Sequence, residues 1–309
     1  MNTKVTVIAI AYNHAPFIQE ALESVEAQAY PNLELILLDD GSSDESADVL
    51  SIMAAKLDVA KLIVHEKNEG YTRTFNQGLA LATGDYVIDF ALDDVMLPGF
   101  ISKSVAALEA AGAYYGVCFS NADFIDAHSK LTGNHYEQLM KKGMIEQMPR
   151  GDVFEMVLKR YFICTPTMVI RRQVFDRIGG YDADLAFEDF DFWVRSSRYY
   201  KYCYVDEVLL QKRKLDNSMS ANRLIHWQNE QLNSVYEVCE KAFALCKSKA
   251  EIEALRQRLS YEYRQCIRTD HSVLATKYLL LLKQTGAGTW LTQFWGWLIA
   301  LGFDPKRVK

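Results

Sequence analysis

Strands and helices alternate through the first hundred residues, and this alternation constrains the fold more than any other feature of the sequence. Short apolar runs lie at residues 5–11, 33–40, 60–67 and 84–92, with amphipathic segments between them. One strand and one helix together take about 25 residues, which predicts right-handed crossovers and a mostly parallel, doubly wound sheet. We therefore expect an α/β fold whose ligands bind beyond the carboxyl ends of the strands.

The composition is that of a soluble globular enzyme with a large core. Of the 309 residues, 50% are hydrophobic and 24% are charged, which is ordinary for such proteins. The net charge of -6 argues against nucleic acid as a partner, because nucleic-acid binding needs a basic surface. The 6 cysteines include no CxxC pair, which indicates reduced thiols and a cytoplasmic location. No apolar run reaches the roughly 18 residues of a membrane span.

The residues that directly follow each strand are the candidates for a binding site. In chain order they are Ala11, Tyr12 and Asn13, then Asp39 and Asp40, then Asn68, Glu69 and Gly70, then Asp93 and Asp94. Two acidic pairs thus meet at one edge of the sheet, with no lysine or arginine beside them in the sequence. Helix capping is one explanation for such aspartates. For Asp93 and Asp94 we favour a divalent cation that bridges to a phosphate, because hard cations bind carboxylate oxygens.

Several motifs, in this order, resemble those of the family 2 inverting glycosyltransferases, which have the GT-A fold. They are VTVIAIAYNHAPFIQEALESVEAQAYPNLELILLDDGSSDES, NEGYTRTFNQGLALATGDYV, ALDDVMLP and GGYDADLAFEDFDFWVR. The resemblance implies a GT-A catalytic domain over residues 1–220, with a nucleotide-binding half at 1–100 and an acceptor half at 101–220. Residues 221–309 then form a helical C-terminal extension.

The resemblance also implies which residues bind the donor. Ala11, Tyr12 and Asn13 would line the nucleotide base, and Asp40 would hydrogen-bond it, while Asp39 holds the loop. The other implied contacts to the donor, or to the helix that supports it, are Asn68, Gly70, Arg73, Asn76, Leu92 and Asp93.

The metal motif departs from the family pattern. The family usually has an acid where this chain has Ala91. Even so, the resemblance implies Mn²⁺ or Mg²⁺ at Asp93 and Asp94, where it would bind the donor diphosphate. Asp89 shares a strand face with Ala91 and Asp93, so it either compensates in part for the missing acid or pairs inside the sheet.

A second departure lies in the segment QKRKLDNSMS. Family members often have a histidine near the place of Lys214, and this chain has Lys212, Arg213 and Lys214 in a row. Protein cations can stabilise a diphosphate leaving group, so Lys212 and Lys214 are candidate diphosphate ligands and metal dependence is expected to be partial. The alternative is a solvated basic turn.

The segment FEDFDFWVR contains the expected catalytic base. An inverting transfer needs one carboxylate that takes the proton from the acceptor hydroxyl, and the resemblance gives this role to Asp189. The residues that would shape the acceptor and sugar pocket are Tyr181, Phe187 and Glu188. Asp191 is expected to pair with Arg195, four residues further on. Without the family context, the segment is equally an acidic helix start that the helix dipole favours.

Beyond residue 221 the sequence predicts helices. Residues 289–303 combine tryptophans with a basic flank, which suits a helix lying on a membrane surface. A helix packed on the protein, or an oligomer contact, is the alternative. Peripheral attachment to the inner face of the cell membrane would suit a lipid-linked saccharide acceptor, which the resemblance suggests.

The function that follows is an inverting transfer from a nucleotide sugar, with a UDP-sugar as the first candidate donor. The acceptor would be a saccharide, in the assembly of a surface polysaccharide. The alternative is a non-catalytic scaffold that binds nucleotide sugars, which Ala91 makes conceivable and Asp189 opposes. The sequence leaves the oligomeric state open, including a homo-oligomer. An NAD-dependent oxidoreductase is disfavoured because no GxGxxG follows the first strand.

Overall fold

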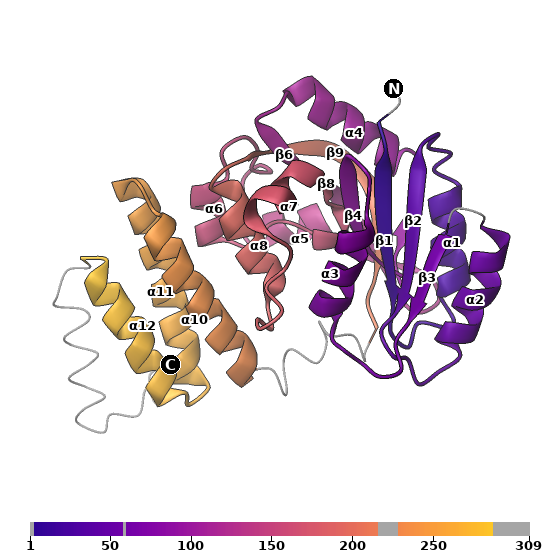
Figure 1. Cartoon of the computed structure of the whole chain (residues 1–309). Helices are drawn as coiled ribbons and strands as arrows, with labels where there is room; N and C mark the ends of the chain where they lie inside the picture. Colours follow the sequence, from indigo (N-terminus) through magenta and orange to yellow (C-terminus); the bar gives the residue numbers. More distant parts are fainter. Residues whose placement is uncertain (1–2, 58–59, 216–227, 287–309) are drawn as a thin grey trace. The chain divides into compact units, whose positions relative to one another are not determined.

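A computed structural model describes residues 3–57, 60–215 and 228–286 (Figure 1). The chain forms two compact units. The first consists of Met1–Val153, Phe162–Ala183 and Tyr199–Asp216, and the second consists of Phe154–Tyr161, Asp184–Arg198 and Asn217–Lys309. Two segments that the sequence analysis placed in the catalytic domain, 154–161 and 184–198, thus belong to the same unit as the C-terminal helices.

Four parallel strands form the first half of the sheet, as the sequence predicts. They are β1 (Val5–Ala11), β2 (Leu33–Asp39), β3 (Ala60–Val64) and β4 (Tyr86–Ala91), in the order β3-β2-β1-β4. In β1, Val7 is paired with Leu35 of β2 and with Ile88 of β4. All residues of β1 are buried, which explains its uninterrupted apolar run, because both faces of a parallel sheet are covered.

The second half of the sheet is mixed. The order continues β4-β8-β6-β9-β5, through β8 (Val169–Arg171), β6 (Tyr115–Ile125), β9 (Lys201–Arg213) and β5 (Val95–Met96), and β7 (Leu131–Asn134) pairs with β6. β6 and β9 are parallel, whereas β8 and β5 run antiparallel to their partners. The predicted α/β fold is confirmed, and its parallel character is confined to β1–β4 and the β6–β9 pair.

Helices cover both faces of the parallel half (Figure 1). On one face, α1 (Ile18–Glu26), α2 (Ser46–Lys56) and α4 (Phe100–Ala111) pack on a core that includes Val7 and Leu35. On the other face lies α3 (Tyr71–Leu81). A Cβ on Gly78 of α3 would lie 2.5 Å from Cγ2 of Ile8, so glycine allows α3 to approach the sheet closely.

The rest of the first unit contains short elements. They are α5 (His135–Lys141), the 3₁₀ helix η1 (Thr165–Thr167) and α7 (Arg172–Ile178). Asn134 caps α5 by accepting the backbone N–H of Glu137 at 3.2 Å.

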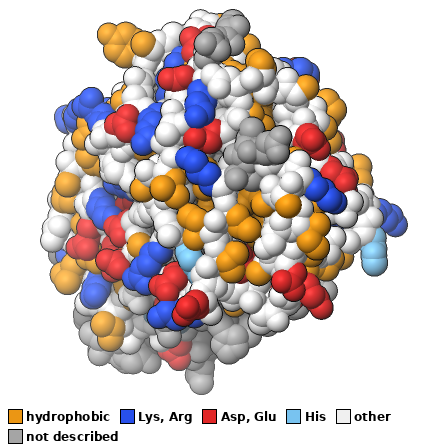
Figure 2. Space-filling model, turned by 45° about the vertical axis from the view of Figure 1, so that its right-hand side comes forward, with side chains coloured by type: hydrophobic (Ala, Val, Ile, Leu, Met, Phe, Trp, Pro, Cys, Tyr) orange, Lys and Arg blue, Asp and Glu red, His pale blue; other side chains and the backbone are white. Residues whose placement is uncertain are grey.

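On the face of the molecule shown in Figure 2, Lys and Arg side chains are interspersed with Asp and Glu.

The described part of the second unit contains helices and their connecting loops, and no strand. The helices are α6 (Phe154–Lys159), α8 (Glu188–Ser197), α10 (Gln228–Leu245), α11 (Lys249–Arg268) and α12 (Ser272–Gln284). The predicted helical C-terminal region is therefore confirmed between Gln228 and Gln284, whereas residues 289–303 lie outside the described residues. Within the described ranges, no helix combines the length and the apolar character that a bilayer crossing requires.

Candidate functional site

The loops after β1 and β2 hold each other at the carboxyl end of the sheet. Ser42 Oγ accepts the backbone N–H of Asn13 at 2.9 Å, and Asn13 Oδ1 accepts the N–H of Ser43 at 2.8 Å. Asn13 has a positive φ of 56°, a conformation that asparagine tolerates better than most residues. Tyr12, next to it, is 44% exposed. The side chain of Asn13 therefore shapes the loop, while Tyr12 presents an accessible ring at this edge.

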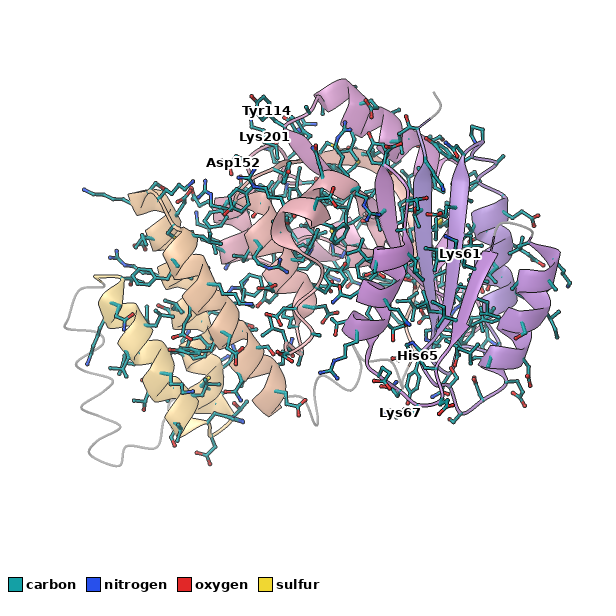
Figure 3. All side chains as sticks on the ribbon, in the orientation of Figure 1. Lys61, His65, Lys67, Tyr114, Asp152 and Lys201 are labelled. Carbon is teal, nitrogen blue, oxygen red and sulfur yellow. The ribbon has the colours of Figure 1, made fainter. Side chains whose placement is uncertain are left out.

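Asp39 and Asp40 both bind protein groups. Asp39 accepts the N–H and the hydroxyl of Ser42 at 2.8 and 2.6 Å, so it holds its loop. Asp40 is 2% exposed. Its Oδ1 accepts the N–H of Glu69 at 2.9 Å and the Thr74 hydroxyl at 2.7 Å, and lies 3.3 Å from His65 Nδ1, at the end of β3 (Figure 3). Asp40 therefore joins the end of β2 to the start of α3.

The candidates on and before α3 have different surroundings. Gly70 precedes the helix with a φ of 95°, and Asn68 and Arg73 are exposed. The Asn76 amide donates to the carbonyl of Tyr181 at 2.8 Å and accepts the N–H of Tyr181 at 2.9 Å. The structure thus places Asn76 as a support for the Tyr181 loop, and its amide is committed to that backbone.

Asp93 and Asp94 follow β4 and differ sharply in burial. The Asp93 side chain is 13% exposed, and its Oδ2 lies 3.9 Å from Nε2 of His14. Asp94 is buried and its Oδ1 accepts the backbone N–H of Arg213 at 2.8 Å. Burial raises the pKa of Asp94 well above its usual range, and the neighbouring Asp93 adds to this shift. Of the two carboxylates, Asp93 is the one available to a ligand.

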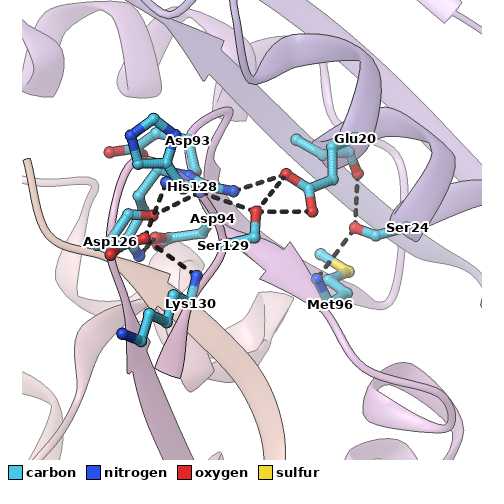
Figure 4. A network of polar contacts seen from close by, with 11 residues as sticks. Glu20, Ser24, Asp93, Asp94, Met96, Asp126, His128, Ser129 and Lys130 are labelled. Atoms are coloured by element: carbon cyan, nitrogen blue, oxygen red, sulfur yellow. Dashed lines mark hydrogen bonds and ion pairs between the residues drawn. The ribbon is translucent and has the colours of Figure 1, made fainter. Parts of the chain in front are cut away.

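A buried arginine that the sequence analysis did not single out organises the loop of Asp93. The Arg213 side chain is 0% exposed. Its Nε donates to the carbonyl of Asp93 at 2.8 Å, Nη1 to the carbonyl of Asp126 at 2.8 Å, and Nη2 to Glu20 Oε2 at 2.7 Å. Glu20 also accepts the Ser129 hydroxyl at 3.1 Å (Figure 4). Arg213 therefore ties the Asp93 backbone to the Asp126 loop and to Glu20 of α1.

The lysines beside Arg213 have less direct roles. Side chains alternate along β9, so Lys212 and Lys214 point away from the face that Arg213 occupies. Lys214 Nζ lies 3.3 Å above the ring centroid of Phe124. Burial lowers the pKa of Lys214, and the charge of Lys212 lowers it further. Their contact with a diphosphate stays a prediction.

The residues fit a metal that the substrate helps to bind. Among the described residues, no group of three or more His, Cys, Asp or Glu side chains is arranged to hold a metal ion. Mg²⁺ in nucleotide sites commonly takes one or two carboxylates plus substrate phosphates, and the partly exposed Asp93 is the candidate for one of them. His14 is a second candidate, because its Nε2 lies 3.9 Å from Asp93 Oδ2 and its buried Nδ1 has no hydrogen-bond partner in the described part of the chain. Asp89 instead accepts the Tyr71 hydroxyl at 2.5 Å, inside the unit.

The candidate base lies in the second unit, in the first turn of α8. Glu188, Asp189 and Asp191 are the acids of this turn, where the helix dipole favours negative charge. Asp191 is 0% exposed, and Arg195 pairs with it at 2.6 Å, as the spacing predicts. Phe187 is buried, with its ring centroid 5.1 Å from that of Tyr161, so it belongs to an aromatic core. Tyr181 lies in the first unit.

Comparison with known proteins gives consistent matches. Residues 6–179 match the model of a family described as Glycosyl transferase family 2. An uncharacterized glycosyltransferase of Haemophilus influenzae is 31% identical over 238 residues, which cover 73% of this chain and 70% of the relative. The putative glycosyltransferase EpsE of Bacillus subtilis is 28% identical over 242 residues, which cover 77% and 82% of the two chains.

Solved structures share the fold at low sequence identity. S. aureus TarS 1-349, in complex with UDP-GlcNAc, has a TM-score of 0.69 and 16% identity, over 91% of this chain and 81% of that chain. Mannosyltransferase PcManGT from Pyrobaculum calidifontis, in complex with GDP-Man and Mn²⁺, has a TM-score of 0.62 and 17% identity, over 98% and 80%.

Proposed function

The chain belongs to glycosyl transferase family 2, and we propose that it transfers a sugar from a nucleotide-sugar donor to a saccharide acceptor with inversion at the anomeric carbon. The main support for this proposal is the position and exposure of Asp93. This residue follows β4 at the carboxyl end of the parallel strands, where ligands of such sheets bind. Arg213 donates a hydrogen bond to the backbone carbonyl of Asp93, and the Asp93 carboxylate remains partly exposed.

The donor is proposed to bind across the loops after β1, β2 and β4. Tyr12 offers its exposed ring to the base, and the Asn13 loop forms the wall beside it. Asp40 fixes the loop before α3 and takes the base-binding role that the family pattern gives it. The UDP-GlcNAc of the TarS complex supports a UDP-sugar, whereas the GDP-Man of PcManGT makes a GDP-sugar the second choice.

The diphosphate is proposed to lie at Asp93. A divalent metal held there by Asp93, with His14 as the second protein ligand, would supply positive charge for the leaving diphosphate. Asp94 has a different role, because its buried carboxyl holds the N–H of Arg213. Lys212 and Lys214 are the candidate cations on the other face of β9.

Asp189 is proposed as the general base. It would accept the proton of the acceptor hydroxyl while that oxygen attacks the anomeric carbon, and the diphosphate leaves with the bonding electrons. Inversion in one displacement needs no second carboxylate as nucleophile. Glu188 in the same turn would contact the sugar, and the buried Phe187 would support that turn from within the second unit.

The substitution Asp189→Asn tests this assignment. We expect donor binding to be nearly unchanged and transfer to fall at least about a hundredfold, because that is the usual scale for loss of a general base. UDP release from UDP-GlcNAc, with a panel of saccharide acceptors and with water, measures transfer. Asp176→Asn is the control, since Asp176 is exposed on α7. If the Asp189 variant turns over like the wild type, another group is the base. If the wild type binds UDP-GlcNAc and never releases UDP, the protein is the non-catalytic scaffold.

The acceptor is proposed to be a lipid-linked saccharide in the assembly of a surface polysaccharide. The tryptophan-rich segment 289–303 supports this only through its sequence, because it lies outside the described residues. A peripheral position on the inner face of the cell membrane would bring the enzyme to such an acceptor.

A further inference from the structure

We propose that the C-terminal helices α10 and α11 position the base helix α8, through Ser234, Lys241 and Arg258. The inference rests on the proposed role of Asp189 as the base. It gives the C-terminal region a part in catalysis that the sequence pattern does not indicate.

The first contact fixes the chain just before α8. The helix has Phe187 at its N-cap, with no hydrogen bond from that side chain to the helix, so α8 lacks the usual capping group. The N–H of Ala186 instead donates to Ser234 Oγ of α10 at 2.7 Å. Ser234 is 5% exposed, so water does not readily replace this bond. The serine thereby sets where the chain enters the turn that carries Asp189.

The second contact fixes the rotation of α8 about its axis. Asp191 is 0% exposed and bonds Arg195 within the helix and Lys241 Nζ of α10 at 2.9 Å. A buried carboxylate is costly unless it is paired. A rotated α8 would separate Asp191 from Lys241, and Asp189 would turn with it, because the two aspartates belong to the same helical turn.

The third contact holds the residue next to Asp189. Arg258 of α11 is 4% exposed, and its guanidinium lies 3.9 Å above the ring centroid of Tyr161 and 5.4 Å above that of Phe190. Its Nε donates to the carbonyl of Leu158 at 3.0 Å and its Nη1 pairs with Glu262 at 3.1 Å. Such buried cation–π contacts are among the stronger ones. Arg258 thus joins α6, α8 and α11.

These contacts matter for catalysis because α8 is short and a base must be placed accurately. The helix has 10 residues, fewer than the roughly 12 that an isolated helix needs to be even marginally stable. Its position therefore depends on its neighbours. A displacement of about 1 Å at a catalytic group can lower the rate on the order of a hundredfold.

The test compares Ser234→Val with Ser234→Thr in the full chain. The two replacements have nearly the same shape, and only threonine keeps the hydroxyl. Two quantities are measured: hydrogen exchange of residues 184–198, and kcat and KM for UDP release from UDP-GlcNAc with water as acceptor. We expect the threonine variant to match the wild type. We expect the valine variant to exchange faster in this segment and to lose about tenfold in kcat, with KM for the donor unchanged. Equal kcat in the two variants overturns the proposal.

A second pair covers the case in which the valine variant does not fold. Lys241→Met removes one of the two partners of Asp191 and leaves Arg195. Lys249→Met is the matched control, because Lys249 is exposed at the start of α11. We expect a loss of about tenfold in kcat for the first substitution only, with Lys241→Arg restoring most of it. Equal turnover of the two methionine variants contradicts the positioning role.

Failure of the proposed function has a different signature. A wild type that releases neither UDP from UDP-GlcNAc nor GDP from GDP-Man contradicts the proposed function. The exchange of residues 184–198 then decides the positioning role alone: faster exchange in Ser234→Val than in Ser234→Thr supports it, and equal exchange overturns it.

Discussion

Asp93 and Asp94 are neighbours in sequence, and their surroundings give them different chemistry. Asp93 keeps a partly exposed carboxylate beside His14, whereas the Asp94 carboxyl is enclosed and accepts a backbone N–H. Because Asp94 is 3% exposed and its carboxyl holds the N–H of Arg213, that carboxyl is less accessible to a ligand than the Asp93 carboxylate. We therefore propose Asp93 as the metal ligand and Asp94 as a structural residue.

Glu34 shows the opposite electrostatic case, at a position remote from catalysis. Its carboxylate accepts the Thr6 hydroxyl at 2.7 Å, the N–H of Thr83 at 2.7 Å and Lys4 Nζ at 2.9 Å. Burial alone would raise the pKa of Glu34, but these hydrogen bonds outweigh it and lower the pKa to about 2. A carboxyl with a lowered pKa stabilises the fold above its unfolded-state value of 4.5, and this stabilisation is lost as pH falls toward 2.

We expect Glu34→Gln to lower the free energy of unfolding by about 2 kcal/mol at pH 7, because charge-assisted hydrogen bonds are weakened. The difference from the wild type should shrink as pH falls below 4.5. Urea unfolding at a series of pH values measures it, with Glu66→Gln as the exposed control. A difference that does not change with pH would show that the charge of Glu34 is not responsible.

At this scale the sequence predicts the acidic pairs, and it misses Arg213 and His14. A run such as Lys212–Lys214 shows three cations and gives no sign of which one is enclosed. Strand alternation separates Arg213 from its neighbours, but the choice of face depends on the pairing of β9 with β5 and β6. The only signal in the sequence is that successive side chains of a strand point to opposite faces. This signal can identify the buried residue only after the strand and its partners are known.

At the scale of elements, β1 to β4 were predictable and the second half of the sheet was not. The first four strands are continuous apolar runs separated by amphipathic helices. In contrast, β8 has 3 residues and β5 has 2, too few for a recognisable pattern. Strand β6 is paired with β9, which begins at Lys201, far along the chain. Antiparallel pairs such as β4 with β8 need no crossover helix. Several short elements separate the parallel strands β6 and β9, so this pair lacks the simple strand–helix–strand alternation of the first half.

The contact between α3 and the loop at Tyr181 gives a prediction at this scale. In Asn76→Asp, a carboxylate oxygen would replace the amide that donates to the Tyr181 carbonyl, so one hydrogen bond becomes a repulsion. We expect the free energy of unfolding to fall by about 2 kcal/mol, as measured in urea. Asn68→Asp, on the exposed loop before α3, should change it by less than about 0.5 kcal/mol. Equal stability of the two variants would mean that Asn76 does not hold this loop.

At the scale of the whole molecule, the expected GT-A fold is confirmed by the family match and by the likeness to TarS and PcManGT. The division into two units was harder to predict. Segments 154–161 and 184–198 join the second unit because their partners are side chains such as Lys241 and Arg258, far along the chain. A segment is assigned to a domain from the pattern of its own residues. That pattern does not indicate which distant residues, such as Lys241 and Arg258, the segment will contact.

Deletion of residues 289–309 gives a prediction for the whole chain. We expect the shortened protein to leave the membrane fraction, because tryptophans and basic residues at an interface contribute most of the affinity of a peripheral helix. Sedimentation of the full and shortened chains with vesicles of anionic lipid measures this. If both chains sediment alike, the segment is a packed helix or an oligomer contact.

The most direct test of the proposed donor site is calorimetric titration of the whole protein with UDP, in Mn²⁺ and in EDTA. GDP and dTDP serve as comparison nucleotides, and Asp93→Asn and Asp94→Asn as variants. We predict that UDP binds more tightly in Mn²⁺, that Asp93→Asn removes this gain and that Asp94→Asn keeps it. Binding that is equal in Mn²⁺ and EDTA, or absent for every nucleotide, would contradict the proposed donor site.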